Sequence, residues 1–164
     1  AALVMGDALA IALLEERHFS PEDFALLHPG GNLGRKLLLQ VGDIMHTGEQ
    51  IPIVSENTNM KDVILEMTSK RFGVTSVVNN KGELVGVFTD GDLRRLIEKT
   101  SHFFDLQAKE VMTNNPKVIS EKALAARALN LMEFSNITCL MIVNGERKPM
   151  GIVHLHDLLK AGVV

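Results

Sequence analysis

The chain has 164 residues, enough for one ordinary domain or two small ones. Its 17 basic and 20 acidic residues give a formal net charge of −3, and 46% of its residues are hydrophobic, which is typical of a folded protein. This balance argues against a nucleic-acid partner, because binding to phosphate backbones requires a basic face or a basic excess. No apolar run is long enough to span a bilayer and no basic opening of a signal peptide is present, so we expect no membrane partner and a cytoplasmic protein.

Residues 1–40 differ in kind from the rest of the chain. Apolar residues recur with helical spacing between Ala1 and Arg17, which predicts a helix there. Ser20 and Pro21 are typical of a second helix start, and the breaker cluster His28-Pro29-Gly30-Gly31 predicts its end. Two short helices cannot enclose a core alone, so we expect this segment to pack on another part of a longer protein or to be partly disordered.

An internal repeat begins at about residue 41. Ile53 aligns with Val118, an offset of 65 residues, and the alignment runs without a gap for about forty residues. Further aligned pairs are Ser55 with Ser120, Met67 with Met132, Gly86 with Gly151, and Asp92 with Asp157. Upstream, Ile44-Met45 matches Val111-Met112 after a two-residue insertion. The repeat predicts two units, over residues 41–104 and 105–164.

Each unit is predicted to run strand, helix, strand, strand, helix, which makes the fold class α/β. In the first unit we expect strands over 51–55, 75–79 and 84–88, with helices near 60–67 and 92–99. In the second we expect strands over 117–120, 139–143 and 150–154, with helices near 125–132 and 155–161. Met60, Met67 and Met132 fall at helical spacing and are expected in the core, and Cys139 is expected to be a buried, inert thiol.

The third strand of the first unit ends in a pattern that can carry chemistry. Gly86, Thr89 and Asp92 form G-x-x-T-x-x-D at the start of a helix. A carboxylate there can accept both ribose hydroxyls, while a hydroxyl and the free helix N–H groups can meet a phosphate. The alternative is that Thr89 and Asp92 only cap the helix. Asp90 and Arg94 are secondary candidates in the same stretch.

This repeated pattern, with its G-x-x-T-x-x-D motif, resembles a pair of CBS domains. The resemblance covers residues from about 41 to 164 and implies a nucleoside-phosphate site at Thr89 and Asp92. In the second repeat His154 stands where threonine is expected, followed by His156 and Asp157. We therefore predict two unequal sites, with these three residues as secondary nucleotide contacts.

The segment before the repeats resembles the end of a sugar isomerase (SIS) domain. Residues 2–10 and 24–35 are similar in particular to the D-arabinose 5-phosphate isomerase family, in which a CBS pair follows the SIS domain. This resemblance implies interconversion of ribulose 5-phosphate and arabinose 5-phosphate, a step toward the lipopolysaccharide sugar Kdo. Only His28 matches a position that the family uses at its active site, so we expect no isomerase turnover from this chain.

Three roles for the repeat pair remain open. In the first it senses a nucleotide and regulates the isomerase, with CMP-Kdo or an adenine nucleotide (AMP or ATP) as ligand and no required cofactor. In the second it is a structural module without ligand that helps to assemble the parent protein. Under either role we expect a homodimer of this chain, within a larger homo-oligomer of the parent protein. In the third His154 and His156, with His46 or His102, bind a metal, although side chains two apart on a strand point to opposite faces.

Overall fold

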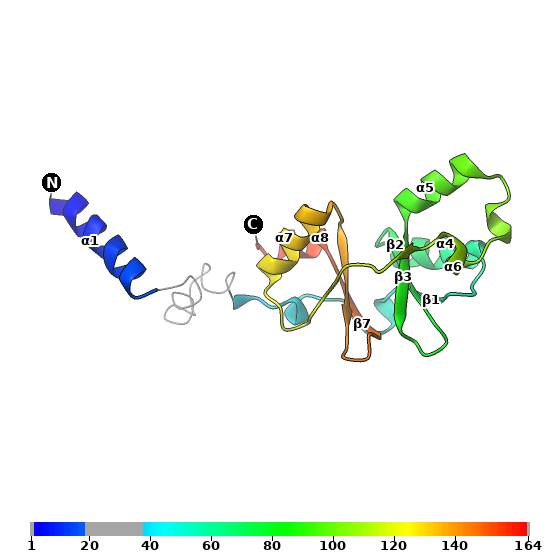
Figure 1. Ribbon diagram of the computed structural model, residues 1–164, viewed down its shortest axis with the longest axis horizontal. Helices are drawn as coiled ribbons and strands as arrows, with labels where there is room; N and C mark the ends of the chain where they lie inside the picture. Colours follow the sequence, from blue (N-terminus) through cyan, green and yellow to red (C-terminus); the bar gives the residue numbers. More distant parts are fainter. Residues whose placement is uncertain (1, 19–37, 164) are drawn as a thin grey trace.

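The computed structural model describes residues 2–18 and 38–163 (Figure 1). The predicted first helix is present as α1 (Ala2–Glu16). From Val4 onward its large apolar side chains are exposed, from 46% at Leu14 to 70% at Val4. The helix expected over 20–27, and His28, lie outside the described residues. Among the described helices, none has the length and apolar character to cross a membrane.

The first sheet has the strand order β1-β2-β3-β4. Its strands are β1 (Ile53–Ser55), β2 (Val74–Val78), β3 (Leu84–Thr89) and β4 (Thr113–Asn114), with helices α4 (Met60–Lys70) and α5 (Asp90–Lys99). β1 runs parallel to β2, while β2–β3 and β3–β4 are antiparallel. Gly82 takes a φ of +78° in the tight turn between β2 and β3, a conformation that favours glycine.

The second sheet has the order β5-β6-β7 and repeats the same topology. Its strands are β5 (Val118–Ile119), β6 (Cys139–Val143) and β7 (Pro149–His154), with helices α7 (Ala125–Ser135) and α8 (Leu155–Lys160). β5 is parallel to β6, and β6 antiparallel to β7. The predicted order of strand, helix, strand, strand, helix is thus confirmed in both halves. The strands β1 and β5 are shorter than predicted.

The opening segment of each repeat packs on the sheet of the other repeat. A 3-10 turn, η1 (Val41–Asp43), donates backbone hydrogen bonds to Ala123 and Glu121, both 2.8 Å long, in the second repeat. Conversely, α6 (Ala108–Val111) and β4 pack on the first sheet, where Ala108 donates to the backbone of Thr58. Two further 3-10 turns, η2 (Gly48–Gln50) and η3 (Phe103–Asp105), lie in the connections. The sequence repeat and the packed unit are therefore different divisions of the chain.

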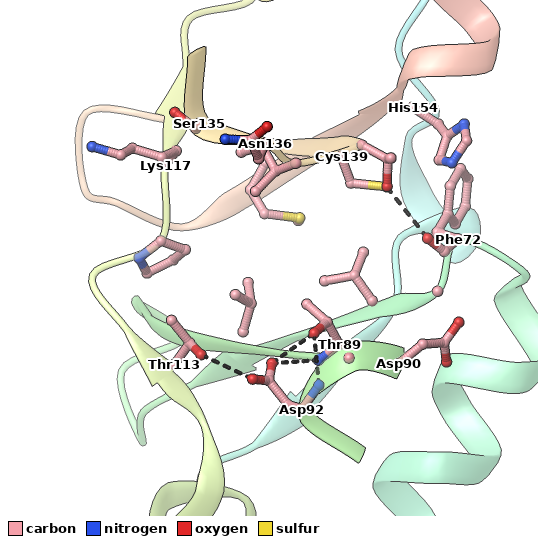
Figure 2. Close-up of a pocket in the computed structure, with 18 of the residues that line it drawn as sticks. Phe72, Thr89, Asp90, Asp92, Thr113, Lys117, Ser135, Asn136, Cys139 and His154 are labelled. Atoms are coloured by element: carbon pink, nitrogen blue, oxygen red, sulfur yellow. Dashed lines mark hydrogen bonds between the residues drawn. The ribbon is translucent and has the colours of Figure 1, made fainter. Parts of the chain in front are cut away.

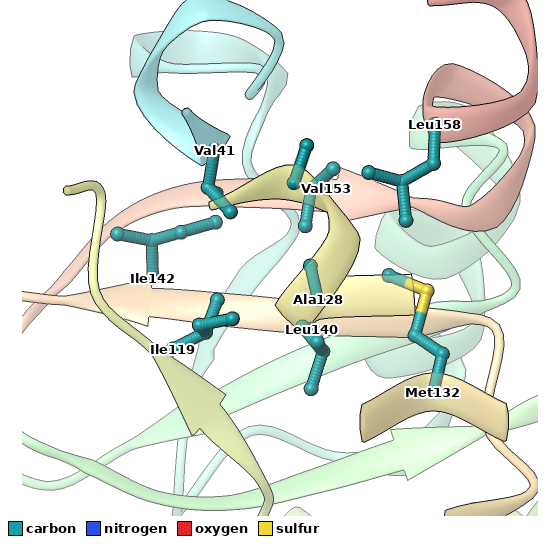
Figure 3. Close-up of a cluster of buried hydrophobic side chains, with 9 residues drawn as sticks. Val41, Ile119, Ala128, Met132, Leu140, Ile142, Val153 and Leu158 are labelled. Carbon is teal, nitrogen blue, oxygen red and sulfur yellow. The ribbon is translucent and has the colours of Figure 1, made fainter. Parts of the chain in front are cut away.

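Each half of the molecule, meaning one sheet with its helices and the opening segment that packs on it, has its own apolar core. Val41 packs with Ile142, Val153 and Leu158 in the second half (Figure 3). The expected core methionines Met60, Met67 and Met132 are at most 2% exposed, which confirms their packing role. A third cluster, formed by Ile51, Val74, Leu84, Met141 and Ile152, lies where the two sheets meet. Contacts between the halves such as Arg147 Nε to the Leu84 carbonyl, 3.0 Å, join the two sheets.

Candidate functional site

A cleft of about 800 Å³ opens between the two halves (Figure 2). The end of β3 and the start of α5 form one wall, and residues that precede and begin β6 form the other. The polar and charged side chains that line it are Arg71, Thr89, Asp90, Asp92, Arg95, Thr113, Asn115, Lys117, Ser135, Asn136, Thr138 and His154. Both repeats therefore contribute to one site.

Thr89 and Asp92 lie together on the wall formed by the first repeat. Thr89 is the N-cap of α5, and its Oγ1 accepts a hydrogen bond from the Asp92 backbone N–H at 3.1 Å. In return, Asp92 Oδ2 accepts from the Thr89 backbone N–H at 3.0 Å and from its hydroxyl at 2.7 Å. The pair thus forms a capping box, so the helix-capping role considered in the sequence is present.

The other oxygen of Asp92 faces two further groups. Arg95 Nη2 donates to Oδ1 at 2.7 Å, and the Thr113 hydroxyl lies 3.4 Å from the same atom. Burial works against the charged carboxyl, but hydrogen bonds from Thr89 and Arg95 outweigh it, so the pKa of Asp92 is lowered. The carboxylate is ionised at neutral pH. The Arg95 side chain is 64% exposed and that of Asp92 only 13%, so the arginine is the more accessible partner of the pair.

The cleft is lined by more positive than negative side chains. Its positive residues are Arg71, Arg95 and Lys117, and its negative residues are Asp90 and Asp92. Arg94, which the sequence suggested, is exposed and does not line the cleft, whereas Arg95 does. The position of Arg95 could have been predicted from the sequence. Residues three apart on a helix lie on the same face, and Arg95 comes three residues after Asp92.

The second repeat presents its candidate residues differently. His154 lines the cleft, but His156 and Asp157 do not. His154 is the N-cap of α8, where its Nδ1 accepts from the His156 backbone N–H at 3.0 Å. Burial lowers the pKa of His154, so its imidazole is neutral at pH 7. The imidazole thus replaces the threonine hydroxyl as helix cap.

Several lining residues were not singled out in the sequence. Ser135 Oγ is buried and has no hydrogen-bond partner among the residues that the structure describes. Cys139 also lines the cleft, where its thiol donates to the Phe72 carbonyl at 3.3 Å. Cys139 is half-buried and not buried as expected, but desolvation still raises the pKa of its thiol to about 12, which disfavours the reactive thiolate. Ser135, Arg71 and Lys117 stand outside any motif, so only the folded chain brings them to Thr89.

Metal-binding clusters are absent from the described part of the chain. Within residues 2–18 and 38–163, no three His, Cys, Asp or Glu side chains are grouped so that they can hold an ion. His46 contacts Asp157 instead, with Nε2 and Oδ2 3.1 Å apart.

Comparison with known families identifies the repeats. The CBS domain family matches residues 41–99 and 108–164, which are most of the chain. The chain belongs to the CBS domain family. The tandem arrangement predicted from the internal repeat is thereby confirmed.

Curated relatives extend the similarity to the whole chain. Arabinose 5-phosphate isomerase KdsD of Yersinia pestis is 49% identical over all 164 residues, and KdsD of Escherichia coli K12 has the same identity. KdsD of Pseudomonas aeruginosa is 48% identical over 162 residues. The chain spans about half the length of these relatives, since it covers 50% of each.

Solved CBS structures share the fold. CBSX2 in complex with AMP superposes with a TM-score of 0.64 at 24% identity, covering 76% of this chain and 96% of that one. The CBS pair of MJ0100 in complex with 5-methylthioadenosine and S-adenosylmethionine gives a TM-score of 0.67 at 20% identity, covering 75% of this chain and 94% of that one. These likenesses confirm a mixed α/β CBS pair.

Proposed function

We propose that this CBS pair binds a nucleotide or nucleotide sugar and regulates a D-arabinose 5-phosphate isomerase of which it is part. The isomerase assignment rests on 49% identity over the full 164 residues to curated enzymes of that name. The observation that carries the regulatory part is the cleft at Thr89 and Asp92, which both repeats line. A ligand held by both halves can change how they sit against each other, which is the physical requirement for a regulatory signal.

The chemistry of the cleft supports an anionic ligand with a ribose. Arg71, Lys117 and the N-terminal N–H groups of α5 favour a phosphate. Asp92 is ionised and largely buried, so ribose hydroxyls can replace the exposed Arg95 and the distant Thr113 hydroxyl at its Oδ1. In this proposal Thr89 and Asp92 are the principal contacts.

Two ligand classes fit the proposal. CMP-Kdo carries a ribose, a phosphate and an acidic sugar, and it would report on the end product of a pathway that begins with arabinose 5-phosphate. Adenine nucleotides are the other class, supported by the AMP complex of CBSX2, which has the same fold. The excess of positive side chains along the cleft suits either ligand.

The test is a thermal-shift titration of this chain with CMP-Kdo, CMP, AMP and ATP, with Asp92→Ala as the site variant. A ligand at a hundred times its Kd stabilises the fold by about 2.7 kcal/mol, which is readily measured. Glu98→Ala, an exposed change on the same helix, is the matched control. A shift that persists in Asp92→Ala, or no shift with any ligand, contradicts the proposed site.

A structural role is the second candidate, because Thr89 and Asp92 already satisfy each other as a capping box. Large apolar side chains are exposed on α5, α7 and α8, at 53% for Ile97, 88% for Phe134 and 49% for Leu159. A dimer through such helices would cover them. Sedimentation equilibrium of Phe134→Ser against the unchanged chain tests this: the dimer predicts a lower mass for the variant, and equal masses contradict a dimer through α7.

A further inference from the structure

We propose that His46 closes the nucleotide site of the second repeat, so that the chain binds one nucleotide and not two. The inference rests on the proposed nucleotide function, since it concerns the second copy of the same ribose-binding carboxylate. That carboxylate is Asp157, the repeat counterpart of Asp92 at an offset of 65 residues.

The two carboxylates have matching helix contacts. Asp157 Oδ2 accepts from the His154 backbone N–H at 3.1 Å, as Asp92 Oδ2 accepts from Thr89 at 3.0 Å. Each also meets a side chain from the opening segment of the other repeat. At Asp92 this is Thr113, which contacts Oδ1, and at Asp157 it is His46, which contacts the capping oxygen Oδ2. The two residues correspond in the repeat, since Met45-His46 aligns with Met112-Thr113. The two sites differ in these two residues and in the helix cap, which is Thr89 in the first repeat and His154 in the second.

Thr113 is a weak obstacle to a ligand. Its hydroxyl lies 3.4 Å from Asp92 Oδ1, the outer limit of a hydrogen bond, and its side chain is short. Arg95, the other group at that oxygen, is 64% exposed and can turn away into solvent. The cleft accordingly reaches Asp92.

His46 is held from several directions. Its Nε2 lies 3.1 Å from Asp157 Oδ2, and its Nδ1 lies 3.3 Å from Gln50 Oε1. The ring packs edge-on against Phe72, with centroids 5.0 Å apart. Its backbone exchanges two hydrogen bonds with Ile152, of 2.8 and 3.0 Å. A ribose that binds Asp157 Oδ2 must displace the imidazole from that oxygen, and with it the contacts of the ring with Gln50 and Phe72.

The shape of the cleft agrees with this difference. It includes the whole turn from Thr89 to Asp92 in the first repeat, but in the second it stops at His154 and includes none of residues 155–157. His154 also lacks the hydroxyl with which Thr89 can meet a phosphate. The second repeat therefore retains the carboxylate of the motif, but this carboxylate lies outside the cleft and in contact with His46.

Calorimetric titration with AMP and with CMP tests the inference through stoichiometry. Four chains are compared: the unchanged chain, His46→Thr, His46→Thr with Asp157→Ala, and Asp92→Ala. Threonine is chosen because it reproduces the residue at the open first site. We expect one nucleotide per chain, two in His46→Thr, one again when Asp157 is also replaced, and none in Asp92→Ala. Circular dichroism and the melting temperature establish that each variant folds.

The outcomes separate the two proposals. Two nucleotides on the unchanged chain, with one lost in Asp157→Ala alone, overturn the closure, as does a folded His46→Thr that still binds one. The single variant Asp157→Ala also serves if His46→Thr does not fold, because closure predicts that it leaves nucleotide stoichiometry and Kd unchanged. If the unchanged chain binds none but His46→Thr binds one, the closure stands and the proposed function fails. No binding in any variant overturns both.

Discussion

The thioether of Met112 lies over Gly86: a Cβ built on that glycine would come within 2.5 Å of the sulfur and 3.1 Å of the methionine Cβ. The pair joins the opening segment of the second repeat to the sheet of the first. Met45 lies over Gly151 in the same way, with the sulfur 2.6 Å from the built Cβ. The glycine of the G-x-x-T-x-x-D motif is thus needed so that the opening segment of one repeat can pack on the sheet of the other. This requirement holds whether or not a ligand binds.

This relationship predicts that Gly86→Ala and Gly151→Ala destabilise the fold. The added methyl group meets methionine atoms as far back as Cβ in the first case, so a rotation of the sulfur alone cannot relieve the clash. Overpacking of this kind costs about 1–3 kcal/mol. Urea unfolding measures it, and Gly145→Ala is the control because nothing lies within 4 Å of its built Cβ. Equal unfolding midpoints for all three variants contradict the close packing of Met112 on Gly86 and of Met45 on Gly151.

The order of the elements follows from the sequence because it depends on local signals. Apolar spacing predicts α4 and α7, and turn residues separate β2 from β3. The proximity of Thr89 and Asp92 is predicted for the same reason, since the N-cap residue of a helix and the residue three positions after it are neighbours. Arg94 is the arginine predicted from the sequence, but helical spacing from Asp92 indicates Arg95, which is the arginine that lines the cleft.

The remaining features depend on distant parts of the chain. The sequence repeat aligns Met45 with Met112 but does not indicate that each packs on the opposite sheet. β4 has only two residues, both exposed, and exists because it pairs with β3. His46 and Asp157 meet across 111 positions, so no motif reveals the contact. Ser135 and Lys117 reach the cleft in the same long-range manner.

Asp92 is expected to make the fold sensitive to acid. Its pKa in the folded chain is lowered from 3.8, the net result of burial opposed by hydrogen bonds from Thr89 and Arg95. A lowered carboxyl pKa gives stability that is present above the unfolded value and lost as the pH falls through the folded value. Asp92→Asn should therefore lose stability at pH 7 and lose less than the unchanged chain between pH 5 and pH 3.

Urea unfolding at several pH values measures this difference. Glu98→Gln on the exposed side of α5 controls for a change in net charge. Parallel stability curves for Asp92→Asn and the unchanged chain below pH 5 would show that the carboxylate is not stabilised in the folded state.

The contribution of His154 to the stability of the fold is expected to change in a different pH range. Burial lowers its pKa from 6.5, so between the two values the unfolded chain binds more protons than the folded one. The fold then weakens as the pH falls from about 7 through 6.5. His154→Thr keeps a helix-capping side chain but removes this imidazole, so its stability should gain on the unchanged chain between pH 7.5 and 5.5. Thermal melts at both pH values measure the gain, with exposed His102→Thr as control. The same gain in both variants would contradict a specific role of His154.

Cys139 is expected to react slowly in the folded chain. The thiolate is the reactive form of cysteine, and burial raises the pKa of this thiol to about 12, so little thiolate exists at pH 7.5. Its Sγ also donates to the Phe72 carbonyl at 3.3 Å. Since Cys139 is the only cysteine of the chain, a disulfide reagent such as DTNB reports on this site alone. We expect modification at pH 7.5 to be at least tenfold slower in buffer than in 8 M urea.

Because Cys139 lines the same cleft as Thr89, a bound nucleotide should slow the modification of Cys139 further, in the unchanged chain but not in Asp92→Ala. Rates that are equal in buffer and urea would place the thiol in solvent and contradict its position between the two sheets.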